Sequence, residues 1–247
     1  MSSWPALADE LRAWRDTGVV PELWWRDDDA GALTPALERL LGLSRSAGVA
    51  LTIAAIPAAA QPEMLAKAGF VVMHGCDHRN RAARGEKKTE FPASESDDAA
   101  LARLAQSRER LAQLAGERFV PVLAPPWNRL RAELVARLPE AGLRGLTRYG
   151  ARRLARALAV LEVNTHVDLI AWRGDRRFLG EAPALALLLQ HLRARRSASA
   201  DLQEPSGILT HHALHDAATW AFLERLFDET RARGAVWLDA AEVFARA

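Results

Sequence analysis

The sequence predicts an α/β fold, and more specifically a distorted (β/α) barrel of seven or eight strands. Short apolar runs rich in Val, Ile and Leu alternate with amphipathic stretches along the chain, a pattern typical of strands joined by helical crossovers. No glycine-rich turn follows the first run, which favours a TIM-barrel-like arrangement over an open doubly wound sheet. The length of 247 residues and the 49% of hydrophobic residues suit one such domain over residues 1–247.

Eight apolar runs are the predicted strands. They are Leu23–Arg26, Ala50–Ile56, Phe70–Met73, Val120–Ala124, Leu143–Leu146, Leu158–Val163, Gly207–Thr210 and Ala235–Leu238. In a barrel and in an open parallel sheet alike, the functional site is expected at the carboxyl ends of these strands.

Three helices have clear signals in the sequence. Pro35 after Thr34 predicts a helix that ends before Gly48, because Pro is favoured at the first helical position and Gly just past the last. The other two are identified by their apolar stripes: one begins near Asp97 and carries Leu101, Leu104, Leu111 and Leu114, and one covers Asp216–Arg233 with Trp220, Leu223, Leu226 and Phe227 facing inward. Two polar stretches interrupt the alternation, Arg79–Ser96 and Arg193–Ser206, and we interpret the second as a surface loop rather than a domain linker.

The charge balance and the single cysteine exclude several classes of protein. With 33 basic and 31 acidic residues the net charge is +2, so we expect neither a nucleic-acid nor a membrane partner. The longest apolar run, Val49–Ala60, is too short to cross a bilayer. Charged residues within Met1–Gly18 argue against a signal peptide, and Cys76 has no partner for an intrachain disulfide, so we expect a cytoplasmic protein. The oligomeric state is left open.

Three adjacent carboxylates follow the first predicted strand. Asp27, Asp28 and Asp29 come directly after Trp24, Trp25 and one arginine, and carboxylates so close together beside apolar rings are costly without a compensating cation. A solvated turn is the alternative interpretation of the triplet taken alone.

Two histidines follow the third predicted strand. His74 and His78 are four positions apart, which lets both imidazoles reach one metal ion, although such a pair can also be structural. There is no Glu at the second position, so the metalloprotease helix motif does not apply. We interpret Cys76 as a small buried residue rather than a ligand, since two His and one Asp already make a three-ligand set with an open position.

Further polar residues follow two other predicted strands. His211 and His212 come after the seventh run and are candidates for acid–base catalysis, because imidazole titrates near neutral pH. For His212 and the nearby His215, packing at the start of the next helix is the alternative. After the fourth run, residues 125–129 form a stiff turn that presents Trp127 and Asn128.

Together these groups resemble the motifs of the polysaccharide deacetylase family, carbohydrate esterases with a chitooligosaccharide-deacetylase (NodB) homology domain. The resemblance extends from Trp24 to His212 and matches four motifs in order: Thr-Phe-Asp-Asp-Gly at residues 26–30, His-(Ser/Thr)-x-x-His at 74–78, Arg-x-Pro-(Tyr/Trp) at 124–127 and Leu-x-His at 209–211. It implies that Asp28 is the catalytic base and His211 the general acid. It also implies a divalent metal, which we expect to be zinc, on Asp29, His74 and His78. We assign substrate contacts to Trp127, Asn128 and Arg129.

Two departures from the family pattern stand out. The arginine that orients the base is replaced by Ala124, so that either Arg26 or Arg129 has to supply the positive charge. The family motif of an Asp followed by a Trp is matched only loosely, by His166, Asp168 and Trp172, and we assign no role to these residues.

The expected function is therefore a metal-dependent hydrolase that removes N-acetyl groups, by amide hydrolysis, from a carbohydrate or sugar-containing substrate. One alternative is a metal-dependent amidase that acts on a small intracellular compound. The other is a catalytically silent glycan-binding domain of the same fold.

Overall fold

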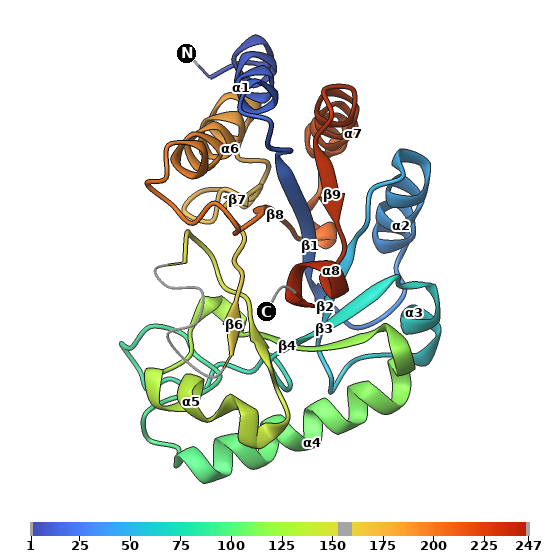
Figure 1. Cartoon of the computed structure of the whole chain (residues 1–247). Coiled ribbons are helices and arrows are strands. Elements are labelled where there is room, and N and C mark those ends of the chain that lie inside the picture. Colours follow the sequence, from blue (N-terminus) through green and yellow to red (C-terminus); the bar gives the residue numbers. More distant parts are fainter. Residues whose placement is uncertain (1, 153–159, 246–247) are drawn as a thin grey trace.

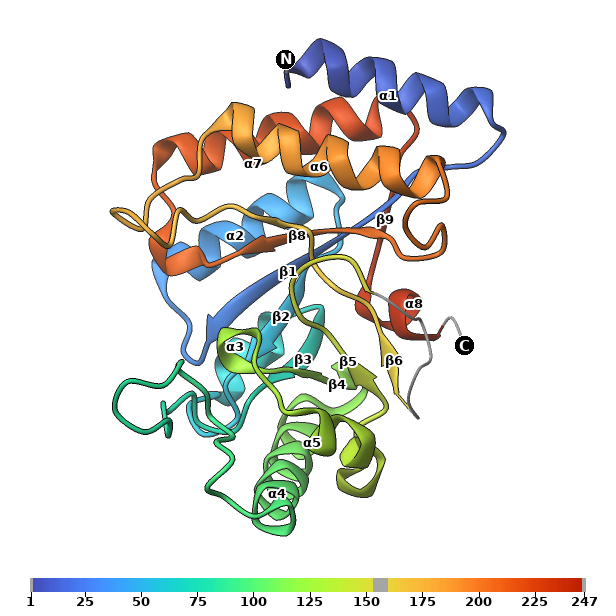
Figure 2. The same cartoon turned by 90° about the vertical axis from the view of Figure 1, so that its left-hand side faces the viewer.

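The strands form one curled parallel sheet. The computed structural model describes residues 2–152 and 160–245, and its sheet has nine strands in the order β6-β5-β4-β3-β2-β1-β8-β7, with β9 paired to β1. The strands are β1 (Glu22–Ala30), β2 (Thr52–Ala55), β3 (Phe70–His74), β4 (Phe119–Ala124), β5 (Gly145–Leu146), β6 (Leu161–Glu162), β7 (Val167–Asp168), β8 (Ser206–Thr210) and β9 (Val236–Leu238). Figures 1 and 2 show that the sheet curls into part of a barrel, as predicted.

Helices cover the outside of the curled sheet. They are α1 (Trp4–Asp16), α2 (Pro35–Ala47), α3 (Pro62–Lys67), α4 (Asp97–Ala115), α5 (Ala132–Arg137), α6 (Glu181–Arg196), α7 (Ala217–Arg231) and α8 (Ala240–Ala245). In Figure 2, α1, α6 and α7 lie together above β1 and β8, and α4 and α5 lie at the opposite end of the molecule below β4. The short α8 instead contacts β3 and β4. Within the described ranges, no helix is long and apolar enough to cross a membrane.

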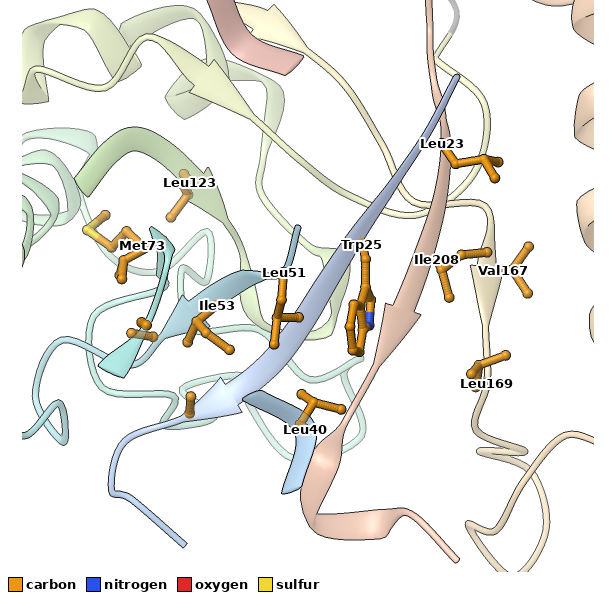
Figure 3. Packing of buried hydrophobic residues seen from close by; sticks show 14 of the residues in the cluster. Leu23, Trp25, Leu40, Leu51, Ile53, Met73, Leu123, Val167, Leu169 and Ile208 are labelled. Atoms are coloured by element: carbon orange, nitrogen blue, oxygen red, sulfur yellow. The ribbon is translucent and has the colours of Figure 1, made fainter. Parts of the chain in front are cut away.

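Both faces of the central strand are buried. Leu23 and Trp25 pack with Ile208 of β8 in the large core beneath the helices (Figure 3), whereas Trp24 packs with Val163 on the inner face. Successive side chains of a strand point to opposite faces, so a strand covered on both faces is apolar without alternation. This explains why β1 begins as a continuous apolar run.

All eight predicted apolar runs contain a strand, although residues 158 and 159 of the sixth run lie outside the described residues. The three predicted helices are confirmed as α2, α4 and α7, and Gly48 ends α2 in the left-handed conformation (φ 59°). Two interpretations were wrong in detail. The acidic triplet lies inside β1 rather than after it, and Arg193–Arg196 belong to the last turn of α6, not to a loop. The sequence also gave no signal for β7, which is two residues long.

Candidate active site

An irregularity near the end of β1 directs two consecutive aspartates to one side of the sheet. The register with β2 shifts between Asp27 and Ala30, and Asp29 has a positive φ of 70°. In a regular strand Asp28 and Asp29 would point to opposite faces, and a bulge changes that alternation. Here Asp28 Oδ2 lies 4.0 Å from His74 Nδ1 and Asp29 Oδ1 lies 3.0 Å from His74 Nε2. Both carboxylates therefore face the same imidazole.

Asp29, His74 and His78 form a compact group that fits a divalent metal. Asp29 Oδ1 lies 3.0 Å from His74 Nε2 and 3.2 Å from His78 Nε2, and the three ligand atoms lie within 4.8 Å of one another. The ring of His74 also has the tautomer that a ligand needs. Its Nδ1 lies 3.0 Å from the carbonyl oxygen of Ala124, which can only accept a hydrogen bond, so Nδ1 carries a hydrogen and Nε2 is the nitrogen that faces Asp29 and is free to exchange its proton for a metal ion. Two imidazoles and one carboxylate are a typical zinc ligand set.

The electrostatics of this group agree with a cation site. Burial alone would raise the pKa of Asp29, but hydrogen bonds with His74 and His78 hold it well below its usual range. Burial alone would lower the pKa of His74, yet the charge of Asp28 and the hydrogen bond to Asp29 raise it. The carboxylates thus favour positive charge at the Nε2 position of His74. Cys76 is not part of this group of converging ligand atoms, and burial raises the pKa of its thiol to about 12.

Arg26 holds the carboxylate of Asp28. Its Nε and Nη2 donate to the two oxygens of Asp28 at 2.8 and 3.0 Å, and its Nη1 donates to Thr147 Oγ1 at 2.6 Å. Arg26 is only 1% exposed, so this two-point contact is shielded from water. Arg129 is exposed and donates to the carbonyl of Lys88 instead. Of the two arginines that the sequence left open, it is therefore Arg26 that contacts Asp28.

His211 lies directly after β8 and is enclosed by Trp172. The two rings meet edge to face with centroids 4.8 Å apart, and Trp172 Nε1 donates to Asp168 Oδ2 at 2.6 Å. Burial raises the pKa of Asp168, and the charge of His211 partly offsets that rise. The same charge helps to lower the pKa of Asp29, so the imidazole lies within electrostatic reach of the metal-ligand group. Asp168 and Trp172 matched the family motif only loosely in the sequence. In the structure Trp172 contacts His211 and is itself bonded to Asp168.

The remaining residues of the acidic and histidine runs make structural contacts. Asp27 is fully buried and accepts hydrogen bonds from Thr210 Oγ1 at 2.7 Å and from the backbone N–H of His212 at 2.9 Å, and its other oxygen lies 2.5 Å from His212 Nδ1. It therefore fixes the end of β8 rather than joining the metal-ligand group. His215 packs edge-on against Trp220 at 4.5 Å, and burial lowers its pKa to about 4.

Backbone strain is concentrated at this site. Six non-glycine residues of the described chain have a left-handed φ, and four of them are Asp29, His78, Trp127 and Asn128. Each such residue costs on the order of 1–3 kcal/mol and persists where neighbouring contacts enforce it, as at ligand sites. The ring of Trp127 lies 4.7 Å from that of His78, which brings the turn after β4 to the edge of the metal-ligand group.

A shallow groove extends from this turn. Its cavity volume is about 320 Å³, and Lys87, Phe91, Asn128 and Arg129 are among its lining residues. Two residues assigned to substrate contact, Asn128 and Arg129, therefore face the groove, and the third, Trp127, faces His78.

A second histidine cluster lies apart from the site and does not fit a metal. His166, His191 and Glu204 are buried together, with the two rings stacked at 3.3 Å. His166 Nδ1 accepts a hydrogen bond from the backbone N–H of Gly207, so in the neutral ring Nε2 carries the hydrogen and has no lone pair for a metal. Burial lowers the pKa of His166 to about 3 and that of His191 to about 2, which keeps both rings neutral. Glu204 instead accepts hydrogen bonds from the backbone N–H groups of Arg152, at 3.0 Å, and of residue 164, at 2.9 Å.

Comparisons with known proteins show similarity at the level of the fold. No protein-family model matches the sequence, and no curated protein matches it. Among solved structures, a peptidoglycan N-acetylglucosamine deacetylase is similar with a TM-score of 0.58 and 15% identity over 92% of this chain and 89% of that chain. A putative polysaccharide deacetylase from Mycobacterium smegmatis has a TM-score of 0.59 and 20% identity over 83% and 73% of the two chains. A CE4 family pseudoenzyme from Bacillus anthracis has a TM-score of 0.56 and 16% identity over 91% and 66%.

The chain therefore has the polysaccharide deacetylase fold, as its motifs predicted. Because one of the similar structures is a pseudoenzyme, the fold alone does not define an activity. Any statement on function has to rest on the residues of the site.

Proposed function

We propose that this protein is a metal-dependent hydrolase that removes N-acetyl groups from a carbohydrate or sugar-containing substrate. The observation that supports this most is the convergence of Asp29, His74 and His78, with Nε2 of both imidazoles directed at one oxygen of the carboxylate. A base and an acid, Asp28 and His211, stand next to this group at the ends of β1 and β8.

We assign a divalent ion, expected to be zinc, to Asp29, His74 and His78. When bound there, it supplies a Lewis acid for the amide carbonyl and lowers the pKa of water. Asp28 accepts the proton of the attacking water, and the guanidinium of Arg26 holds its carboxylate in position.

His211 donates a proton to the departing amine nitrogen. Trp172 and Asp168 restrict the orientation of its ring. The developing negative charge on the carbonyl oxygen needs a donor from the turn after β4. The N–H of Asn128 is already bonded to the carbonyl of Pro125 at 2.9 Å, so we assign that role to the N–H of Trp127.

The groove beside Trp127 supports an acidic substrate. Glu86, Lys87 and Arg129 line it, and since neither of these two cations has a carboxylate within ion-pair distance in the described parts of the chain, both are free to bind an anion despite the one carboxylate. Phe91 and Leu130 provide apolar surface on which a sugar ring can pack. We place the remainder of the substrate in this groove, with a phosphate or carboxylate group against the two cations.

The metal assignment is tested by elemental analysis of the purified protein. We expect about one equivalent of divalent metal per chain, lost in Asp29→Ala and His78→Ala. His191→Ala is the matched control, because it removes an imidazole from the second cluster and should retain the metal. If the two ligand variants keep their metal at the wild-type level, the assignment is wrong.

The activity is tested by acetate release from N-acetylated sugars, neutral and acidic. Asp28→Asn should abolish the release while metal remains bound. Turnover of small amides alone would support the amidase alternative. Glycan binding without any turnover would support a silent binding domain, the alternative that the similarity to a CE4 family pseudoenzyme favours.

A further inference from the structure

The segment between the two metal-ligating histidines is built around a buried glutamate from a distant part of the chain. Glu90 lies in the polar stretch after β3 and is 0% exposed. Its Oε1 accepts the backbone N–H groups of Cys76 at 2.9 Å and of Asp77 at 3.0 Å. One carboxyl oxygen thus bonds two of the three residues that join His74 to His78.

Gly75 leaves the space that the carboxyl group occupies. Gly75 has a φ of 61°, and a Cβ atom at this position would lie 2.0 Å from Glu90 Oε2 and 2.7 Å from the ring carbons of Pro126. Non-bonded contacts of a Cβ atom are not this short in proteins, so any side chain at this position would displace Glu90. The resembling motif has Ser or Thr where this chain has Gly75, and here the carboxyl group of Glu90 fills that place.

Glu90 is itself fixed by two arginines. Arg103 Nη2 donates to the carbonyl oxygen of Glu90 at 3.2 Å, and its Nη1 lies 3.5 Å from Glu90 Oε1. Arg81 lies 3.8 Å from the same oxygen and makes a two-point contact with Asp77 at 2.7 and 2.8 Å. Arginines therefore hold both Glu90 and Asp77, one of the residues that Glu90 bonds. This keeps the carboxyl group of Glu90 against the segment.

We propose that Glu90 is a positioning residue that sets His78 against His74 for metal binding. This inference rests on the metal site proposed above. His78 has a strained φ of 56° and needs a segment that enforces it. Without Glu90, two N–H groups in the interior of the segment lose their acceptor, the segment relaxes, and the Nε2 of His78 moves away from Asp29.

The direct experiment is a zinc affinity measurement by competition with a chromophoric chelator. We expect Glu90→Ala to bind zinc about 10- to 100-fold more weakly, the usual effect of losing a residue that orients a ligand. Glu90→Gln keeps an acceptor oxygen and should restore most of the affinity. Glu95→Ala is the matched control, since Glu95 also pairs with Arg103, at 2.8 Å, but does not bond the segment.

A second pair of variants tests the geometry. Gly75→Ala should weaken zinc binding in the wild-type background, because the new Cβ displaces the carboxyl group. In the Glu90→Ala background the same change should cost less, since the clash with the carboxyl group is gone and only the strain of the positive φ and the close contact with Pro126 remain. Equal effects of Gly75→Ala in both backgrounds would contradict the proposed contact.

Amide hydrogen exchange tests the role of Glu90 in the metal-free protein, and so distinguishes a failure of that role from a failure of the proposed metal site. Residues 75–78 should exchange faster in Glu90→Ala than in Glu95→Ala in the metal-free protein. A wild-type protein that binds no zinc would overturn the proposed function and, with it, the role of Glu90 in metal binding. Zinc binding by wild type and Glu90→Ala with equal affinity would overturn the role of Glu90 alone.

Discussion

Replacing Arg26 by Met should remove the guanidinium that bonds Asp28, while the long Met side chain avoids a large cavity. The side chain of Asp28 is 5% exposed, and in the variant it would lose both hydrogen bonds of 2.8 and 3.0 Å. Removing one partner of a buried ion pair usually costs about 3–5 kcal/mol of stability. We therefore expect the free energy of unfolding at pH 7 to fall by about 3–5 kcal/mol.

The activity should change with the stability. Acetate release at neutral pH should fall in Arg26→Met, because a carboxylate that Arg26 no longer holds is not oriented as a base.

The assay is urea unfolding of the metal-free proteins in a double-mutant cycle of Arg26→Met and Asp28→Asn. The exposed pair Arg12 and Asp9, 3.1 Å apart with side chains 60% and 68% exposed, provides the control cycle. Exposed pairs of this kind couple by about 0–1 kcal/mol. A coupling between Arg26 and Asp28 no larger than that of the control pair would refute the buried two-point contact as the support of the base.

Three further predictions follow from packing, protonation and ring orientation. Gly207→Ala should destabilise the fold by about 1–3 kcal/mol in urea unfolding, because its Cβ would lie 2.4 Å from Trp24 Nε1. His191→Asn should make the loss of stability on acidification shallower by up to about 1.4 kcal/mol per pH unit between pH 6 and 4. The sign follows from its folded-state pKa of about 2, since the unfolded chain binds the proton first as the pH falls below 6.5. Trp172→Phe should lower kcat about 10-fold with little change in KM, because the hydrogen bond to Asp168 is lost.

Each of these has its own control. Gly42→Ala, in α2 with nothing within 4 Å of the new Cβ, should not destabilise. An unchanged acid slope in His191→Asn would show that this ring does not stay neutral in the fold. A rise in KM instead of a fall in kcat for Trp172→Phe would mean that the indole binds substrate and does not orient His211.

Much of the candidate site was visible in the sequence because its residues are chemically unusual for their setting. Carboxylates after two tryptophans, and histidines directly after apolar runs, stand out against the strand pattern without any knowledge of contacts. The parallel arrangement then brings the strand ends together. Glu90 gave no such signal, because it lies in a polar stretch where a glutamate is unremarkable and only its burial distinguishes it.

The amino-acid sequence by itself determined the alternation of strands and helices, the edge at which the polar groups gather, and the identity of the three candidate ligands. These are local patterns, read from neighbours along the chain. The tertiary structure decided which charges pair: that Arg26 rather than Arg129 holds Asp28, that Asp27 joins His212 rather than the metal group, and that Glu90 supports the segment of the histidines. The physical reason is that these choices depend on the bulge of β1 and on contacts between distant segments, which fix side-chain directions that no short stretch of sequence specifies.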